Sequence, residues 1–345
     1  MQENKLKIFL IKEIPNVVWI PVLDFVFGQR KTNDLFQNID FNLYADAFDI
    51  VKNPEEADFF LVPHVYSRIK DKRDYINDFV SLSEKYQKSA IIFAYQDSSE
   101  KIDIPRTIIF RPSQYRSSLA ENEVIMPAFV ENMAGLGGVF LKDKKGKPSV
   151  GFVGKAGFEN FFHFIKFFIK NTFLLKDPFK SGIYYRKRAM SFLSKSKDVV
   201  SNFIVRSSYS GNLKSIPLDP SVARKEYLDN IISNDFTLCL KGDGNYSLRF
   251  YETLALGRIP LFIDTDCVLP MEDIIKYDDI IIRVDYKNIA SVASLTEKIY
   301  QGWSQEEYVS KQRKAREVFE KYLYMPVFIK NTFNKKFLSK YEPEI

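Results

Sequence analysis

Two basic side chains and one acidic side chain, Lys241, Arg249 and Glu252, flank a loop with two glycines. Glycines let a ligand approach the main chain closely, and a helix after the loop presents free N–H groups to an anion. A cation in the first helical turn, such as Arg249, opposes the helix dipole and therefore indicates an anionic partner. Glu252 follows three positions later on the same face. A cation for phosphate beside a carboxylate for sugar hydroxyls is what a nucleotide-sugar site needs, although a surface helix with an i,i+3 ion pair has the same spacing.

Regular elements around this loop would position those side chains. The apolar run Phe236–Leu240 predicts a buried strand, and Ser247–Leu256 predicts a helix that Gly257 ends. A second apolar run, Ile259–Ile263, follows at once and predicts another strand. Strand, loop, helix and strand form a βαβ unit, whose loop lies at the carboxyl end of the first strand, where α/β proteins bind ligands.

The same stretch resembles the nucleotide-sugar motif of the exostosin family of glycosyltransferases. The Leu-Pro that closes the family pattern is present as Leu269-Pro270, but Leu240-Lys241 stands where the family has Pro-Arg. Looser similarities lie at residues 53–63, 95–97 and 124–127. The matching positions are Phe236, Cys239, Leu240, Lys241, Gly242, Asp243, Ser247, Arg249, Glu252, Gly257, Ile259 and Pro260.

The resemblance implies two Rossmann-like domains that face a central cleft, the GT-B type. Strands that alternate with helices independently predict an α/β fold with doubly wound, mostly parallel sheets. We expect an acceptor-binding domain at residues 1–134, a glycine- and lysine-rich linker at 135–147 and a donor-binding domain at 148–320. By the same resemblance, the last helix, 321–345, is expected to pack back on the first domain.

The resemblance also implies a set of donor-binding residues. Arg249 and Lys241 would stabilise the charge that grows on a nucleoside diphosphate leaving group. Glu252 would accept hydrogen bonds from ribose hydroxyls, or would instead orient Arg249. Gly154 starts a turn that either faces the same ligand or simply joins a strand to a helix, and the basic residues Arg186 and Arg206 either reach the diphosphate or are solvated. The full predicted set is Lys241, Gly242, Asp243, Gly244, Asn245, Ser247, Arg249, Glu252, Gly154, Arg186 and Arg206.

An inverting sugar transfer needs a general base for the acceptor hydroxyl. Asp97 follows a predicted strand and is one candidate, although it could instead cap the turn after it. His64 is one of two histidines and titrates near neutral pH, but beside Pro63 it could equally be structural. Asp24 is a third candidate.

A metal ion is the other means of neutralising a diphosphate. Asp264-Thr265-Asp266 has the spelling of a metal-binding pair, but we interpret it as a loop after a strand and expect no required metal. By family habit the donor is a UDP-sugar, with GDP-fucose as the nearest rival, and the acceptor is a glycan or glycolipid. A catalytically silent glycan-binding or scaffold subunit is the alternative outside enzymes.

The 345 residues carry a net charge of +6 and 46% hydrophobic residues, as a globular protein of two domains does. No dense basic stripe indicates nucleic acid. Two cysteines, Cys239 and Cys267, are too few for a disulfide framework and are expected to be buried thiols. Without a visible signal peptide, a cytoplasmic enzyme of polysaccharide biosynthesis is expected. The phenylalanine-rich stretch Glu159–Leu175 predicts a buried helix, with peripheral membrane contact through Lys166, Lys170 and Lys176 as the alternative.

Overall fold

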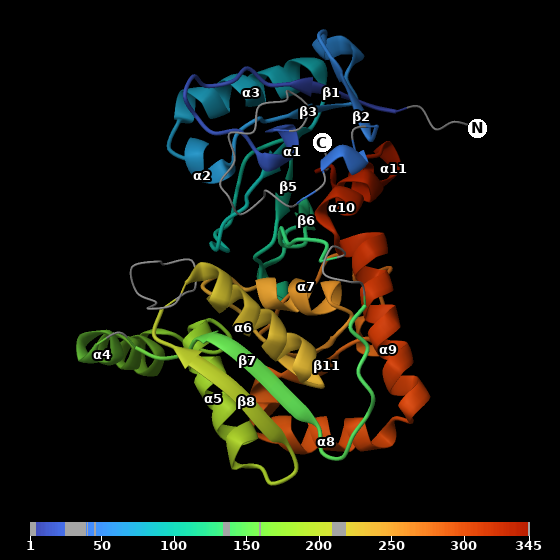
Figure 1. Cartoon of the computed structure of the whole chain (residues 1–345). Coiled ribbons are helices and arrows are strands. Elements are labelled where there is room, and N and C mark those ends of the chain that lie inside the picture. The colour runs from blue at the N-terminus through green and yellow to red at the C-terminus, as the bar shows by residue number, and fades with distance from the viewer. Residues whose placement is uncertain are drawn as a thin grey trace. The chain divides into compact units, whose positions relative to one another are not determined.

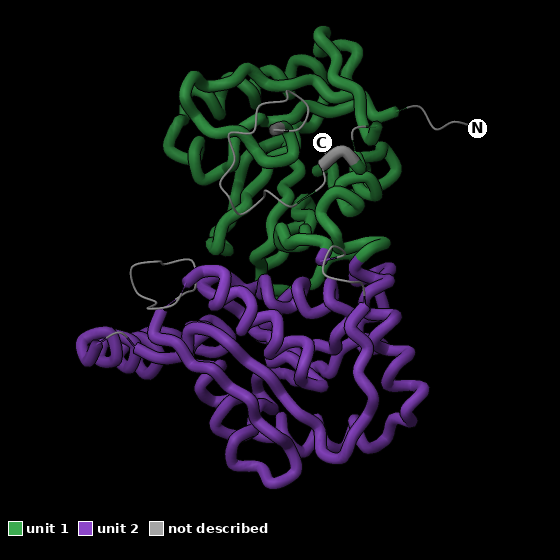
Figure 2. Tube along the Cα trace, in the orientation of Figure 1, with its two compact units in different colours: residues 1–132, 268–271, 320–345 green, residues 133–267, 272–319 purple. Residues whose placement is uncertain are grey.

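The computed structural model describes residues 5–24, 39, 41–44, 46–133, 139–158, 160–208 and 219–343. The chain forms two compact units, shown in green and purple in Figure 2. Unit 1 contains Met1–Asn132, Val268–Met271 and Glu320–Ile345, and unit 2 contains Met133–Cys267 and Glu272–Phe319.

Unit 1 is built on a six-stranded parallel sheet with the order β2-β1-β3-β4-β5-β6. Its strands are short apolar runs, and those in the middle are buried along their whole length, as strands covered on both faces are. The strands are β1 (Leu6–Leu10), β2 (Phe48–Val51), β3 (Phe59–Leu61), β4 (Ala90–Phe93), β5 (Thr107–Arg111) and β6 (Glu123–Ile125). The helices are α1 (Pro21–Asp24), α2 (Tyr66–Ile69), α3 (Arg73–Tyr86), α10 (Met325–Thr332) and α11 (Lys335–Leu338).

The C-terminal helices are part of unit 1 (Figure 2). The ring of Phe333, just after α10, lies 5.4 Å from that of Phe48 and 5.7 Å from that of Phe110. Phe328 on α10 makes an edge contact with Phe110 at 6.3 Å. Aromatic contacts therefore join the end of the chain to strands β2 and β5, which come much earlier in the sequence.

Unit 2 is built on a five-stranded parallel sheet with the order β11-β10-β9-β7-β8. Helices α6 and α7 cover one face, and α5 and α8 pack on each other over the opposite face (Figure 1). The strands are β7 (Ser149–Lys155), β8 (Val200–Arg206), β9 (Phe236–Cys239), β10 (Ile259–Asp264) and β11 (Ile282–Asp285). The helices are α4 (Phe161–Ile169), α5 (Gly182–Lys195), α6 (Pro220–Ser233), α7 (Leu248–Ala255), α8 (Val292–Gly302) and α9 (Gln305–Val318).

These two parallel sheets confirm the predicted α/β fold class with Rossmann-like units. The cleft between the units remains a prediction. Both cysteines are buried thiols, as expected.

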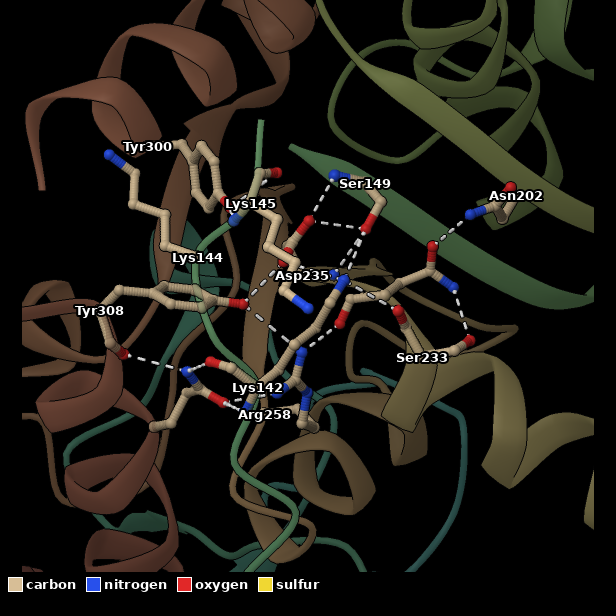
Figure 3. A network of polar contacts seen from close by, with 12 residues as sticks. Lys142, Lys144, Lys145, Ser149, Asn202, Ser233, Asp235, Arg258, Tyr300 and Tyr308 are labelled. Atoms are coloured by element: carbon tan, nitrogen blue, oxygen red, sulfur yellow. Dashed lines mark hydrogen bonds and ion pairs between the residues drawn. The ribbon is translucent and has the colours of Figure 1, made fainter. Parts of the chain in front are cut away.

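A polar network at the amino ends of β7 and β9 fastens the chain before β7 to the sheet (Figure 3). The Asp235 carboxylate accepts hydrogen bonds from the Ser149 N–H at 2.8 Å, the Ser149 hydroxyl at 2.7 Å and the Tyr308 hydroxyl at 3.0 Å. Lys142 Nζ lies 3.0 Å from the same carboxylate. Arg258, which is fully buried, donates to the carbonyl of Phe140 at 3.1 Å. Residues 139–147 therefore lie along α9 and the sheet, while residues 135–138 of the expected linker are outside the described part.

The prediction of a buried helix at Glu159–Leu175 is wrong. Helix α4 and the π-helical turn after it, Lys170–Leu174, carry exposed phenylalanines, with 74% of Phe161 and 73% of Phe173 open to solvent. No residue of α4 is buried, because the helix lies beside the sheet rather than over it (Figure 1). Among the described residues, no helix is both long and apolar enough for a membrane span.

Candidate functional site

The loop from β9 to α7 carries most of the predicted donor-binding residues. It lies at the carboxyl ends of parallel strands, where α/β proteins bind ligands. The Gly242 N–H donates to the Tyr246 carbonyl at 3.0 Å and closes the loop. Ser247 is the N-cap of α7, but its side chain makes no capping hydrogen bond. Neither Gly242 nor Gly244 has a positive φ, so the backbone angles of this loop do not themselves require glycine.

Asn245 is fixed in a structural position beneath this loop. Its side-chain amide donates to the Thr265 and Asp266 carbonyls, both at 3.3 Å, and accepts from the Thr265 hydroxyl at 2.7 Å. Its own carbonyl accepts from Cys267 Sγ at 3.1 Å. Asn245 therefore joins the β9 loop to the β10 loop. Its predicted contact with the nucleotide sugar would have to use an atom other than those that make these hydrogen bonds. Asp243, by contrast, is exposed.

Lys241 is a buried cation at the start of the loop. Its ammonium donates to the Pro178 carbonyl at 2.7 Å and lies 5.3 Å from the centre of the Tyr185 ring. Burial lowers the pKa of Lys241 to about 7, because desolvation disfavours the charged form. An anion that binds beside the ammonium group would raise this pKa again and so restore the positive charge of Lys241.

Arg186 on α5 joins two strand ends. Its Nη1 donates to the Lys155 carbonyl at the end of β7 at 2.8 Å, and its Nη2 donates to the Lys241 carbonyl at 3.0 Å. Gly182, the first residue of α5, lies so close that a Cβ there would be 2.4 Å from the carbonyl oxygens of Lys241 and Gly242. Helix α5 therefore packs directly against the backbone of the loop. Gly182 was missed at the sequence level, since a single glycine at a helix start carries no signal of its partner.

Arg249 crosses from α7 to the end of β7. Its Nη2 donates to the Val153 carbonyl at 2.6 Å, and its guanidinium lies 4.2 Å from the centre of the Phe152 ring. Gly154, with φ of +151°, is the next residue along β7, and a Cβ there would come within 2.8 Å of Arg249 Nη2. Among the described residues, no group accepts a hydrogen bond from the buried Nε of Arg249. The structure thus brings Arg249 and Gly154 together, as the donor-site prediction requires.

Glu252 is held by helix α6 and not by Arg249. Arg224 Nη1 donates to Glu252 Oε1 at 2.7 Å, and the Tyr227 hydroxyl donates to Glu252 Oε2. The Arg249 guanidinium also faces the Tyr227 ring, at 5.8 Å from its centre. The i,i+3 ion pair between Arg249 and Glu252 is therefore absent, and Tyr227 is the residue that contacts both. Arg224 and Tyr227 were not predicted, although their i,i+3 spacing on α6 places them on one face.

Arg206 ends β8 beside the end of β7. It is paired in register with Lys155, and its guanidinium forms an ion pair with Glu226 of α6. The basic residues at this edge of the sheet are Lys155, Arg186, Arg206, Lys241 and Arg249. An edge with this charge can hold an anion such as a diphosphate.

The candidate bases of unit 1 differ in their surroundings. His64 is fully buried; its Nε2 accepts from the Ile14 N–H at 2.8 Å, and its Nδ1 lies 3.2 Å from the Val18 carbonyl. Burial lowers the pKa of His64. Both ring nitrogens thus contact the backbone, which fits the structural interpretation of His64. Asp24 ends α1, and its side chain lies outside the described part.

Asp97 has an exposed side chain, and in the following turn the Glu100 N–H donates at 3.1 Å to the hydroxyl of Ser98 rather than to Asp97. Its loop follows β4 and is held by Arg111, a fully buried residue. Arg111 donates to the Ser98 carbonyl at 2.8 Å and the Glu100 carbonyl at 3.0 Å, and pairs with buried Glu123 at 2.5 Å. The Asp97 carboxylate is therefore exposed to solvent on a loop that Arg111 holds by its backbone carbonyls.

Asp264 of the possible metal-binding pair is engaged by protein groups. Its Oδ1 accepts from the Cys267 N–H at 2.8 Å, and its Oδ2 pairs with Arg283 at 2.7 Å. In the described part of the chain, no three His, Cys, Asp or Glu side chains group as metal ligands would.

Comparison with known proteins gives a family match in unit 2. The Exostosin GT47 domain model matches residues 196–299, a range that contains the β9–α7 loop and helix α6. This confirms the resemblance read from the motif. No curated protein matches the chain.

Solved structures show remote similarity. A mutant of S. aureus TarM in complex with fondaparinux, α-GlcNAc-glycerol and UDP is 11% identical, with a TM-score of 0.40 over 80% of this chain and 55% of that one. Anabaena HepE in complex with UDP-glucose is 9% identical, with a TM-score of 0.41 over 97% of this chain and 100% of that one. A glycosyltransferase from Rickettsia africae is 9% identical, with a TM-score of 0.38 over 98% of each chain.

Proposed function

We propose that this chain, a glycosyltransferase of the exostosin type, moves a sugar from a UDP-sugar to a hydroxyl group of a glycan or glycolipid. The observation that carries the donor site is the position of Arg249. Its guanidinium lies at the carboxyl edge of the sheet beside Gly154, and the described part of the chain offers its buried Nε no hydrogen-bond partner. A buried guanidinium N–H without an acceptor costs stability unless a ligand supplies one.

The chemistry follows from the charges at this edge. The acceptor oxygen attacks the anomeric carbon while the bond from that carbon to the diphosphate oxygen breaks, and the electron pair leaves with the diphosphate. Arg249 and Lys241 stabilise the negative charge that develops there, and electrostatic stabilisation of this kind is often the largest contribution to catalysis. Side-chain cations then do the work that a metal does in other transferases, so we propose that turnover needs no metal.

Glu252 is proposed to accept hydrogen bonds from the ribose hydroxyls. Arg224 and Tyr227 each use one of its oxygens. A carboxylate has about four acceptor positions, so capacity for the ribose remains. Tyr227 contacts both Glu252 and Arg249. It would therefore hold the carboxylate proposed to bind the ribose at a constant distance from the guanidinium proposed to bind the phosphates.

Asp97 is proposed as the general base that takes the proton from the acceptor hydroxyl in an inverting transfer. Its exposed carboxylate and its loop, held by Arg111, support this role over His64, whose ring nitrogens contact the backbone. Asp97→Asn should abolish transfer and leave UDP affinity unchanged.

Binding and turnover with a panel of nucleotides test the proposal. UDP should bind to the wild-type protein and raise its unfolding temperature more than GDP does, and UDP-sugars should be hydrolysed or transferred in the presence of EDTA. Arg249→Ala should lower turnover by ~10²–10³. Arg313→Ala, which removes an exposed arginine of α9, is the matched control and should behave as the wild type.

Each other outcome has a clear meaning. A preference for GDP and GDP-fucose would replace the UDP assignment with the fucosyltransferase alternative. Nucleotide binding without release of a nucleoside diphosphate from any donor would indicate a silent subunit. Unchanged nucleotide affinity and turnover in Arg249→Ala would remove this residue from the site.

A further inference from the structure

Helix α4 and the π-helical turn after it expose a continuous apolar surface. At 100° per residue, the exposed apolar side chains of α4 fall within an arc of about 160°. Phe173 and Leu174 extend the surface beyond the helix. The exposed apolar residues are Phe161, Phe162, Phe164, Ile165, Phe168, Ile169, Phe173 and Leu174. Large exposed patches of this kind in a folded protein mark interaction surfaces.

The opposite side of α4 is fastened to unit 2. The Phe167 ring lies 4.8 Å from that of Phe158, which precedes the helix. Asn160 caps the helix by accepting from the His163 N–H at 2.9 Å. At the other end, buried Asn171 accepts from the Ser181 N–H at 2.8 Å and donates to the Phe167 carbonyl at 2.8 Å. These contacts hold the helix in place while its apolar side stays uncovered.

The charged side chains within residues 160–176 have one sign. Lys166 on α4 lies about 40° outside the apolar arc at 100° per residue, and Lys170, the first residue of the π-helical turn, lies about 80° outside it on the same side; both are exposed. Residues 160–176 contain these two lysines and Lys176, but no aspartate or glutamate. Lysines at the border of an apolar helix face can bury their stems in an apolar layer and keep their ammonium groups at an anionic surface.

We propose that α4 and residues 170–174 form a docking surface for an anionic lipid bilayer, with the phenylalanines in the headgroup–acyl boundary and the lysines at the lipid phosphates. An amphipathic helix with aromatic residues on one face and lysines beside them is the arrangement that binds the membrane interface without spanning it. A protein that covered this surface would place acidic side chains at fixed positions opposite the lysines, whereas a lipid bilayer offers mobile anionic headgroups. The apolar arc and the one-sided charge favour a fluid anionic surface instead. Docking does not depend on the sugar-transfer chemistry, so the two proposals can fail separately.

Co-sedimentation of the full chain with vesicles tests this proposal. The wild-type protein should bind vesicles of phosphatidylcholine and phosphatidylglycerol, more weakly at high salt, and should bind phosphatidylcholine alone poorly. Phe161→Ser with Phe162→Ser should lower partition onto the anionic vesicles by roughly 100-fold. Lys166→Gln with Lys170→Gln should lower it by about thirtyfold, since each lysine near an anionic surface contributes about fivefold.

Two double variants serve as matched controls. Val222→Ser with Ile274→Ser removes two exposed apolar side chains elsewhere, and Lys195→Gln with Lys298→Gln removes the same charge from α5 and α8. Both should bind vesicles as the wild type does. All four variants change exposed side chains, so their unfolding temperatures should match that of the wild type.

The opposite results would overturn the proposal. They are no binding of wild-type protein to anionic vesicles, or equal losses in the control variants. A dimer in solution that the phenylalanine variant abolishes, without vesicle binding, would instead assign the surface to a second copy of this chain.

Discussion

Arg249 occupies the space that a side chain at position 154 would need. Its Nη2 lies 2.8 Å from the place of a Cβ on Gly154 and donates to the carbonyl of the preceding residue, Val153. The absence of a side chain on Gly154 thus allows the guanidinium of Arg249 to contact the end of β7. The two residues are far apart in sequence, and both belong to the proposed donor site.

Gly154→Ala should therefore disturb the donor site as well as the backbone. The φ of +151° is strained for alanine, at a cost of about 1–3 kcal/mol, and the new methyl group would displace Arg249. We expect UDP affinity, measured by titration calorimetry, to fall at least tenfold. Gly146→Ala is the control, because Gly146 also has a positive φ, +52°, but nothing lies within 4 Å of its Cβ position. Equal UDP affinity in the two variants would show that the Arg249–Gly154 contact has no part in binding.

Tyr227 should act with Glu252 rather than alone. Tyr227→Phe removes one hydrogen bond to the carboxylate, and Glu252→Gln weakens the acceptor for both the tyrosine and the ribose. Each change should lower UDP affinity, and in the double variant the losses should not add, because the two groups share one interaction. A double-mutant cycle by calorimetry measures the coupling. Strictly additive losses would mean that Tyr227 does not position Glu252.

Lys241 should make nucleotide binding depend on pH. Its pKa of about 7 means that binding of a diphosphate above this pH must take up a proton. UDP affinity should fall by up to about tenfold per pH unit above pH 7, and Lys241→Met should remove this slope. Calorimetry in two buffers of different ionisation enthalpy measures the proton directly. Observed binding heats that are the same in the two buffers would mean that no proton is taken up and would contradict the prediction.

The same group should also affect stability in a defined pH range. The unfolded lysine holds its proton up to its ordinary pKa of 10.5, whereas the folded one releases it near 7. The contribution of Lys241 to the free energy of unfolding therefore rises between these two pH values and is lost as the pH falls towards 7. Lys241→Met should flatten this rise in urea unfolding.

Asp235→Ala should destabilise unit 2 without touching the candidate site. The change leaves Ser149, Tyr308 and Lys142 without their shared acceptor (Figure 3). Loss of one partner from a buried charged pair costs about 3–5 kcal/mol, measurable as a lower urea midpoint. Under conditions where the variant is folded, UDP affinity should equal that of the wild type. Asp229→Ala is the control, because its ion pair with Lys225 is on the surface and should contribute under about 1 kcal/mol.

The local pattern of the chain was sufficient to find the βαβ unit around Lys241. Apolar runs with the length of strands, a glycine-bearing loop and a helix that ends at a glycine are all interactions between near neighbours, so β9, α7 and β10 lie where they were predicted. The motif also predicted the resemblance to the exostosin family, whose domain model matches residues 196–299, because Lys241, Arg249 and Glu252 fall at fixed spacing within one such unit. The error at Glu159–Leu175 arose because apolar content alone does not say whether another element covers a helix.

The sequence by itself determined the α/β class, the βαβ unit of β9, α7 and β10, and the presence of Lys241, Arg249 and Glu252 on that unit. Only the tertiary structure decided which side chains meet: Arg249 with Gly154, Glu252 with Arg224 and Tyr227, and α5 with the loop through Gly182 and Arg186. The physical reason is range. Backbone preferences and side-chain periodicity act within a few residues, whereas these contacts join separate segments of the chain that only the packing of unit 2 brings within hydrogen-bonding distance.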